Sequence, residues 1–372
     1  MQFLERVRRT AVASWYAVKG DHQGAVERYV VSTAGSRDVV NRPELLGVAF
    51  NLALEQCITS CLVTAPFRPL LEQHPEERVC AVSFLRGGLN FELRRALHSA
   101  YGFNRHSSAF MSSQRYREDG RWYVKEDMYR KLDIPRDAVL IMGDVVATGV
   151  TMENGLRVVI DHIVEIGGSV RALVFFTIGC HKAEKALAAI DERLRQAFPD
   201  YERTVLVYLE GKFKLVDSKS ELRIGIPGTD LVRRGGLITP ELEVSQYDRP
   251  SYLLERCAIY DAGSRAFDIP HYARDVVDYW SEVLRYAEQG WTLGEALLER
   301  WPEGGSLDRD AFMAARAGAW DGVGAALLDD LYHRQRAFFR GELAASERAL
   351  AAVCRERIAR LGELSGLSPE LA

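Results

Sequence analysis

Between residues 138 and 211 short apolar runs alternate with amphipathic segments, and this alternation limits the folds open to the chain. The runs at 138–146, 169–179 and 203–211 are apolar almost throughout, as strands buried on both faces of a sheet are. The segments at 151–167 and 181–198 have the periodicity of helices. Because strands joined through helices pair in parallel, this stretch predicts a parallel sheet with helices on its faces.

Further strands are predicted at 79–85 and 107–115, with a helix at 89–102 between them. Residues 1 to about 75 are expected to be mostly helical, and from about residue 238 to the end the pattern is helical again. We therefore expect an α/β fold with an open, mainly parallel sheet flanked by helices over residues 1–237. This part would carry a helical N-terminal segment, and residues 238–372 would form a helical C-terminal extension.

Composition narrows the classes of function. The 372 residues are 47% hydrophobic, and 48 basic against 52 acidic residues give a net charge of −4. No dense block of Lys and Arg appears, which disfavours nucleic-acid binding. The sequence has neither a long apolar run typical of a membrane span nor the apolar core of a signal peptide, so we expect a cytoplasmic protein that does not enter a membrane. The six scattered cysteines are expected to be reduced and buried.

Residues 139–156, VLIMGDVVATGVTMENGL, begin as a strand and end as a helix. Loops at the carboxyl ends of parallel strands bind ligands, and a helix N-terminus offers free N–H groups to an anion. Gly149 permits close approach of a phosphate, and Thr148 and Thr151 supply hydroxyls. The spacing fits neither a P-loop nor a dinucleotide fingerprint. Alternatively, the threonines simply cap the helix. Asp144 favours a ligand, because an acid at the end of a buried strand needs a partner.

The order of strand, acid, two apolar residues and A-T-G-x-T resembles the phosphoribosyl pyrophosphate signature of type I phosphoribosyltransferases. The resemblance implies that the segment Ala147, Thr148, Gly149, Val150 and Thr151 cradles the ribose 5-phosphate. It also implies that Asp144 contacts the ribose. The family has two adjacent acids, whereas Gly143 stands at the first position here, so ribose contact would depend on Asp144 alone.

Two upstream segments resemble the uracil branch of this family. FLRGGLNF, residues 84–91, is similar to a loop whose arginine and backbone amides meet the pyrophosphate, which implies this role for Arg86, Gly87 and Gly88. YREDGRWYVKEDMYRKLDIP, residues 116–135, is similar to the flexible loop of that branch. Arg117 would be its mobile pyrophosphate contact, with Arg115 or Lys125 as alternatives. The same stretch can also be read as a solvated hairpin.

A downstream segment, RIGIPGTDLVRRGG at 223–236, resembles the loop whose backbone reads the pyrimidine edge. The resemblance implies that Ile226, Gly228 and Asp230 bind the acceptor, although Pro-Gly alone also indicates an ordinary turn. In all, the resemblance covers roughly residues 45–236 and leaves the C-terminal helices outside it.

The function implied is transfer of ribose 5-phosphate from phosphoribosyl pyrophosphate, with Mg²⁺, to a pyrimidine-like base or another small acceptor. The alternative is a regulatory protein that binds phosphoribosyl pyrophosphate and acts through its C-terminal helices. A homodimer through the apolar N-terminal region is possible on this interpretation. His181 is expected to begin a helix rather than to act as a base.

Overall fold

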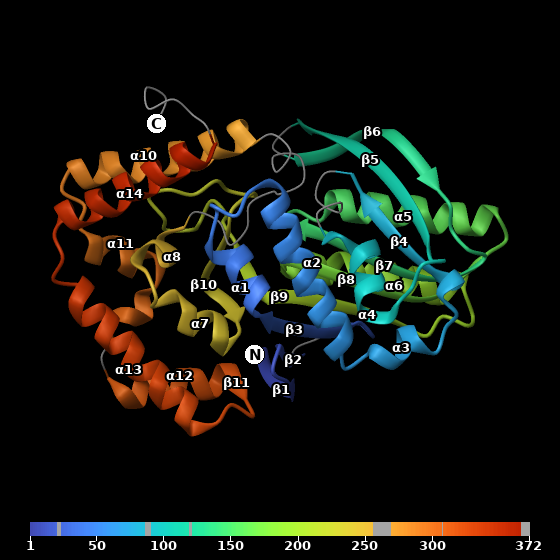
Figure 1. The fold of residues 1–372 in the computed structure, drawn as a ribbon, viewed down its shortest axis with the longest axis horizontal. Helices are drawn as coiled ribbons and strands as arrows, with labels where there is room; N and C mark the ends of the chain where they lie inside the picture. The colour runs from blue at the N-terminus through green and yellow to red at the C-terminus, as the bar shows by residue number, and fades with distance from the viewer. Residues whose placement is uncertain (21–23, 86–90, 119–120, 256–268, 307, 366–372) are drawn as a thin grey trace.

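The computed structural model describes residues 1–20, 24–85, 91–118, 121–255, 269–306 and 308–365, and side chains within these ranges except at 113–128, 364 and 365. The described residues form one sheet of eleven strands with helices on both faces (Figure 1). The strands are β1 Phe3–Arg9, β2 Ala13–Lys19, β3 Glu27–Thr33, β4 Val79–Phe84, β5 Ser107–Glu118, β6 Arg121–Leu132, β7 Asp137–Val146, β8 Ser169–Cys180, β9 Arg203–Leu215, β10 Leu231–Ile238 and β11 Trp320–Asp321.

The strand order is β11-β1-β2-β3-β9-β8-β7-β4-β5-β6, and β10 pairs with β9. The central strands from β3 to β5 are parallel, while β1, β2, β6 and β10 join antiparallel neighbours. The prediction of an open, mainly parallel sheet flanked by helices is confirmed. The carboxyl ends of β4, β7, β8 and β9 therefore meet at one edge of the sheet.

The α-helices described between β3 and β9 are α1 Ala34–Asn41, α2 Gly47–Thr64, α3 Arg68–Glu72, α4 Leu93–Tyr101, α5 Val150–Glu165 and α6 His181–Ala197. Alternate residues of β7 enter two different cores, as period-two side chains must. Val139 and Ile141 pack with α2 and α4, whereas Leu140 and Met142 pack with α5 and α6. The sheet is thus buried on both faces, which explains the almost continuous apolar runs of its central strands.

The expectation of a mostly helical segment up to about residue 75 is wrong for residues 3–9, 13–19 and 27–33, which form β1, β2 and β3, whereas the helices α1, α2 and α3 follow them. The β-branched pair Val30 and Val31 is fully buried in β3, which pairs with β9 in parallel. Pairing of β3 with a strand so distant in the sequence outweighs the local preference of these residues for a helix. The helix α2, Gly47–Thr64, lies in the part of this segment that is helical as expected. By length and composition α2 could cross a membrane. In this fold it packs instead on the sheet, with Leu54, Ile58 and Leu62 in the core.

The remaining helices follow β10: α7 Pro240–Gln246, α8 Pro250–Leu254, α10 Ile269–Glu288, α11 Leu293–Arg300, α12 Arg309–Ala319, α13 Ala325–Glu342 and α14 Glu347–Ser365. We call these helices after β10 the late helices. The two longest of them, α10 and α14, lie side by side (Figure 1). Residues of this region also complete the sheet, because β11 pairs in parallel with β1. Trp320 in β11 is buried, and its indole N–H donates to Ile238 O at 2.8 Å. The late helices are thereby fixed to the edge of the sheet.

Candidate functional site

The loop from Ala147 to Gly149 joins the central strand β7 to α5 at the carboxyl edge of the sheet. Gly149 has a φ of 81°, a left-handed conformation that glycine adopts without strain, and its carbonyl accepts the first helical bond from Glu153 N at 2.9 Å. No side chain caps α5. Thr148 Oγ1 is buried and has no hydrogen-bond partner. The threonines therefore do not act as the helix cap, and the loop offers amide and hydroxyl donors to an anion.

The neighbouring strand supports this loop. Cys180, the last residue of β8, donates its thiol to Ala147 O at 3.2 Å. A methyl group added at Gly149 would lie 3.6 Å from Lys182 O, so α6 begins directly beside the loop. As expected, His181 is the first residue of α6. Partial burial, and then the nearby cations Lys182 and Lys212, lower the pKa of His181. Two helix N-termini consequently lie together at this edge.

Asp144 lies within β7, three residues before Ala147, and is 8% exposed. Its backbone carbonyl accepts the hydroxyl of Thr177 at 2.8 Å, and its Oδ1 accepts Val145 N–H at 2.9 Å. Because side chains alternate along a strand, Asp144 shares the face of Met142, which packs against α5. The carboxylate therefore lies on the face of the sheet that α5 covers, shortly before the loop that leads into α5.

Gly143, where the family has its first acid, faces the opposite side of β7 and contacts Phe91. A Cβ atom built at Gly143 would lie 2.4 Å from Cγ and Cδ1 of the Phe91 ring. Phe91 is 1% exposed, so its ring is held in place. The ring therefore occupies the space that an acidic side chain at residue 143 would need. Sequence reasoning identified the missing acid but not the aromatic ring that replaces it.

Several predicted contacts lie outside the described residues. Arg86, Gly87 and Gly88 fall in residues 86–90, which are not described. The backbone of Arg117 belongs to β5 and is opposite Trp122 of β6, but its side chain is not described, and the same holds for the alternatives Arg115 and Lys125. Residues 107–118 and 121–132 do form two paired antiparallel strands. The roles of these residues stay predictions.

The predicted acceptor residues lie in a turn between β9 and β10. Val146, Gly179 and Lys212 are aligned across β7, β8 and β9, and β9 then continues past this row. The turn at 226–230 pairs with Val216 beyond the end of β9. The turn therefore projects beyond the same edge of the sheet as the loop at 147–149. A donor and an acceptor that react with each other must bind at the same edge, and this arrangement is compatible with that requirement.

Hydrogen bonds close this turn internally. Ile226 N–H donates to Asp230 Oδ2 at 2.8 Å, and Gly228 N–H donates to Val216 O at 2.8 Å. The N–H groups of Thr229 and Asp230 both donate to Ile226 O at 3.1 Å. Ile226 itself is 46% exposed, whereas Asp230 is 1% exposed. Asp230 therefore shapes the turn, and Ile226 is the side chain that the turn presents.

Residues of the late helices hold the segment that leads into this turn. Arg300 of α11 is 5% exposed, and its Nη2 donates to Ile224 O at 2.9 Å. Glu299 accepts Arg223 N–H at 3.1 Å and its own carbonyl accepts Arg234 Nη1 at 2.9 Å. The guanidinium of Arg223 also lies over aromatic rings of the late helices. The C-terminal region, which the resemblance does not cover, thus fixes the predicted acceptor turn.

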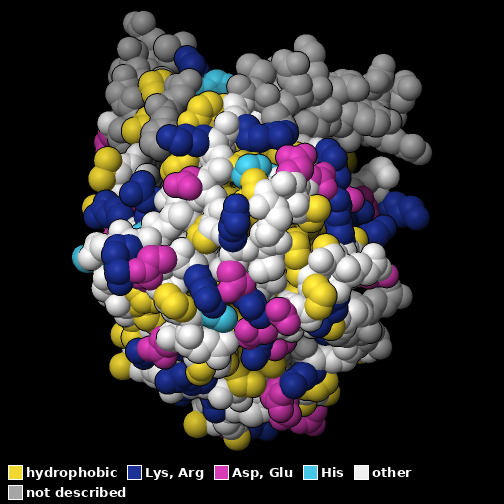
Figure 2. Space-filling view, turned by 90° about the vertical axis from the view of Figure 1, so that its right-hand side faces the viewer, with side chains coloured by type: hydrophobic (Ala, Val, Ile, Leu, Met, Phe, Trp, Pro, Cys, Tyr) yellow, Lys and Arg dark blue, Asp and Glu magenta, His cyan; other side chains and the backbone are white. Residues whose placement is uncertain are grey.

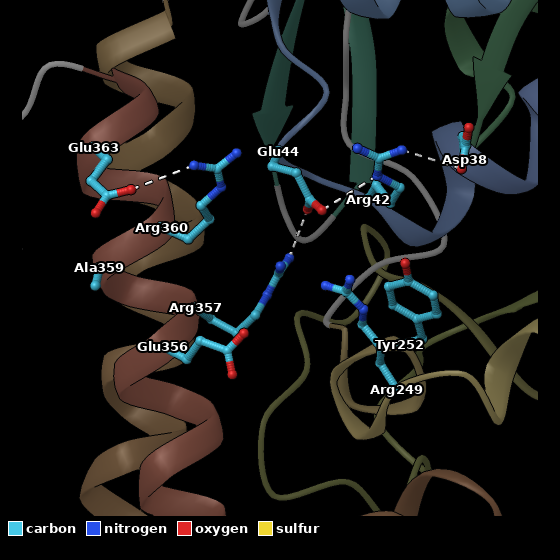
Figure 3. Close-up of a pocket in the computed structure, with 10 residues that line it drawn as sticks. All are labelled: Asp38, Arg42, Glu44, Arg249, Tyr252, Glu356, Arg357, Ala359, Arg360 and Glu363. Carbon is cyan, nitrogen blue, oxygen red and sulfur yellow. Dashed lines mark hydrogen bonds and ion pairs between the residues drawn. The ribbon is translucent and has the colours of Figure 1, made fainter.

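A cavity of about 620 Å³ lies where α14 meets the core, and it contains none of the residues predicted from the sequence. Its charged lining is balanced and consists of Arg42, Arg249, Arg357, Arg360, Asp38, Glu44, Glu356 and Glu363. Figure 3 shows Arg357 of α14 pointing to Glu44, and their ion pair measures 3.0 Å. Although burial alone would raise the pKa of Glu44, the Arg357 guanidinium lowers it. At the wall of this cavity, the ion pair therefore connects α14 to the segment that follows α1.

Glu210 is a buried carboxylic acid that the sequence did not single out. It is fully buried in β9 with a φ of 64°. Its carboxylate accepts Thr33 N–H at 3.1 Å, the Ser36 hydroxyl, and the Thr239 hydroxyl at 2.9 Å. Thr33 and Thr239 are the N-caps of α1 and α7. Burial raises the pKa of Glu210 to about 7. Glu210 thereby links β9 to the starts of two helices.

Figure 2 shows the face opposite the late helices, where basic and acidic side chains are interspersed over the residues that the structure describes.

Comparisons with known proteins give weak similarity. No protein-family model and no curated protein matches the sequence. Among solved structures, a hypoxanthine-guanine phosphoribosyltransferase from Bacillus anthracis aligns over 35% of this chain and 67% of its own, at 14% identity and a TM-score of 0.24. A purine phosphoribosyltransferase from Pyrococcus horikoshii aligns over 51% of this chain and 99% of its own, at 13% identity and a TM-score of 0.20. A hypothetical protein from Neisseria gonorrhoeae with bound ppGpp aligns over 34% of this chain and 66% of its own, at 11% identity and a TM-score of 0.23. Similarity at this level assigns neither a family nor a function to the chain.

Proposed function

We propose that this protein binds phosphoribosyl pyrophosphate at the loop 147–151 and transfers its ribose 5-phosphate to a small acceptor, releasing pyrophosphate. The observation that carries the proposal is the uncapped N-terminus of α5 behind Gly149, with the buried and unpartnered hydroxyl of Thr148 beside it. A phosphate group satisfies both features, because it accepts hydrogen bonds from amides and hydroxyls and is favoured by the helix dipole.

The reaction needs positioning and charge stabilisation rather than a protein nucleophile. The loop would hold the 5-phosphate while Asp144 supports the ribose, where positive charge develops as the bond to pyrophosphate breaks. Arg86 and Arg117 would neutralise the leaving pyrophosphate. Gly87 and Gly88 would bring backbone amides to the same group.

Mg²⁺ suits such a site because it binds oxygen ligands and commonly uses one carboxylate together with substrate phosphates. Asp144 provides a carboxylate just before the loop. When bound, Mg²⁺ would offset negative charge on the pyrophosphate.

The alternative of a regulatory protein draws support from Phe91. The ring beside Gly143 excludes a second acid and leaves ribose contact to Asp144. A protein of this kind would bind phosphoribosyl pyrophosphate without turning it over, so binding and turnover must be measured separately.

The test is calorimetric titration with phosphoribosyl pyrophosphate and Mg²⁺, followed by an assay for pyrophosphate release with a panel of nucleobases. Thr148→Val and Asp144→Ala should each weaken binding by about tenfold or more, since each removes a hydrogen bond to a charged ligand. Thr59→Val is the matched control, because Thr59 lies on α2 over the other face of the sheet. No binding by the unmodified protein would refute the proposal. Binding without release for every acceptor would support the regulatory alternative instead.

A further inference from the structure

The backbone of the turn at 226–230 has no N–H group left for a ligand. Ile226, Gly228, Thr229 and Asp230 all donate within the turn or to Val216, and Pro227 has no N–H. A base with exocyclic oxygens, such as uracil, requires donors opposite those oxygens. The backbone of this turn cannot supply them, so the pyrimidine-edge reading implied by the family resemblance does not fit the observed hydrogen bonds.

The same turn is rich in acceptors. Among the described residues, none donates a hydrogen bond to the carbonyl of Pro227, Gly228 or Thr229. Pro227 and Thr229 are exposed, and the apolar side chain of Ile226 lies next to them with 46% of its surface exposed. The turn therefore presents an apolar contact together with carbonyl oxygens. The one remaining donor on it is the hydroxyl of Thr229.

The turn is also held against rearrangement. Arg300 and Glu299 bind the backbone of residues 223 and 224 from α11, and Asp230 is almost fully buried. Releasing the N–H of Ile226 for a ligand would leave the buried Asp230 oxygen without that donor, which is costly. The late helices thus keep the turn in the state without free N–H groups.

We propose that this turn selects acceptors that present an exocyclic amino group to its carbonyl oxygens, such as amino-substituted nitrogen heterocycles, and that it discriminates against bases that present an exocyclic oxygen there. The selection rests on the proposed function, since it assumes that the turn faces the acceptor. An exocyclic oxygen placed against these carbonyls would lose its hydrogen bond to water without replacement, which lowers affinity by about tenfold or more.

The test compares adenine, which has an exocyclic amino group at C6 and an acceptor at N1, with hypoxanthine, which has an exocyclic oxygen at C6 and an N–H at N1, and it includes uracil. Pyrophosphate release and the binding of each base to the protein saturated with Mg²⁺ and pyrophosphate are measured. Adenine should be preferred by about tenfold or more in binding, and in turnover wherever release is observed. Equal or better binding of hypoxanthine or uracil would overturn the inference, and so would binding of none of the three bases.

Two variants connect the preference to the turn. Ile226→Asn adds an amide donor at an exposed position and should reduce the preference for adenine severalfold, whereas Val164→Asn, on an exposed position of α5, should leave it unchanged. Thr229→Val removes the remaining hydroxyl and should increase the preference. If neither Ile226→Asn nor Thr229→Val changes it, the turn does not read the acceptor. Calorimetry with phosphoribosyl pyrophosphate separates the two ideas: loss of donor binding by the unmodified protein contradicts the proposed function, whereas intact donor binding with the wrong base preference contradicts only this inference.

Discussion

Replacing Gly143 by alanine tests whether Phe91 excludes a side chain at the position of the missing acid. The added Cβ would lie 2.4 Å from two ring carbons and 2.8 Å from Phe91 Cβ, so the ring must move by about 1 Å to reach ordinary contact. Phe91 is 1% exposed and packs within the hydrophobic core. Overpacking of this kind lowers the free energy of unfolding by about 1–3 kcal/mol. Urea denaturation at constant pH measures this change.

A double-mutant cycle isolates the contact. In a Phe91→Gly background neither the ring nor the Cβ atom of residue 91 remains near residue 143, so Gly143→Ala should cost much less than it does beside the ring. The coupling energy should be about 1–2 kcal/mol. Gly318→Ala is the control, because no atom lies within 4 Å of a Cβ built there and alanine favours the helix α12. A neutral effect of Gly143→Ala, or the same cost with and without the ring, would refute the steric explanation.

Three further predictions concern buried charges. Burial raises the pKa of Glu210 from 4.5 to about 7, so the stability that the protonated side chain contributes is lost as the pH rises between these values. Glu210→Gln should therefore remove about 3 kcal/mol of the pH dependence of the free energy of unfolding, measured by urea denaturation from pH 4 to 8. Arg357→Met removes the cation that Glu44 and Glu255 share and leaves Glu44 paired with Arg42, so it should cost about 3 kcal/mol in the same assay at pH 7. Arg300→Lys removes the planar fork that holds the acceptor turn and should raise the KM of the acceptor severalfold while the Kd of phosphoribosyl pyrophosphate stays unchanged; a change in that Kd alone would contradict the assignment of Arg300 to the acceptor side.

Local sequence signals were sufficient where an element is defined by its own residues. The strand predicted at 138–146 and the helix predicted at 151–167 are observed as β7, Asp137–Val146, and α5, Val150–Glu165. Strand burial on both faces and the glycine between the elements are local properties, so periodicity and turn chemistry locate them. The sequence therefore predicted the backbone that would carry the phosphate loop.

Features that depend on distant pairs could not be predicted in this way. β3 is defined by its pairing with β9, although the first residues of the chain have an amphipathic pattern that suggests helix. Phe91 fills the space beside Gly143 from a different element, and Glu210 reaches Thr239 near the start of the late helices. Each of these contacts requires the tertiary arrangement to be known, and no motif in the sequence indicates it.

The contacts between the core and the late helices indicate whether these helices influence binding of the donor or of the acceptor in the proposed reaction. β11 joins the far edge of the sheet at β1, and Arg300 holds the acceptor turn. The loop at 147–149, by contrast, is held by Cys180 and the start of α6, which belong to the core. Because the two sets of contacts share no residue, changes in the late helices should act on the choice of acceptor and leave binding of the donor phosphate intact.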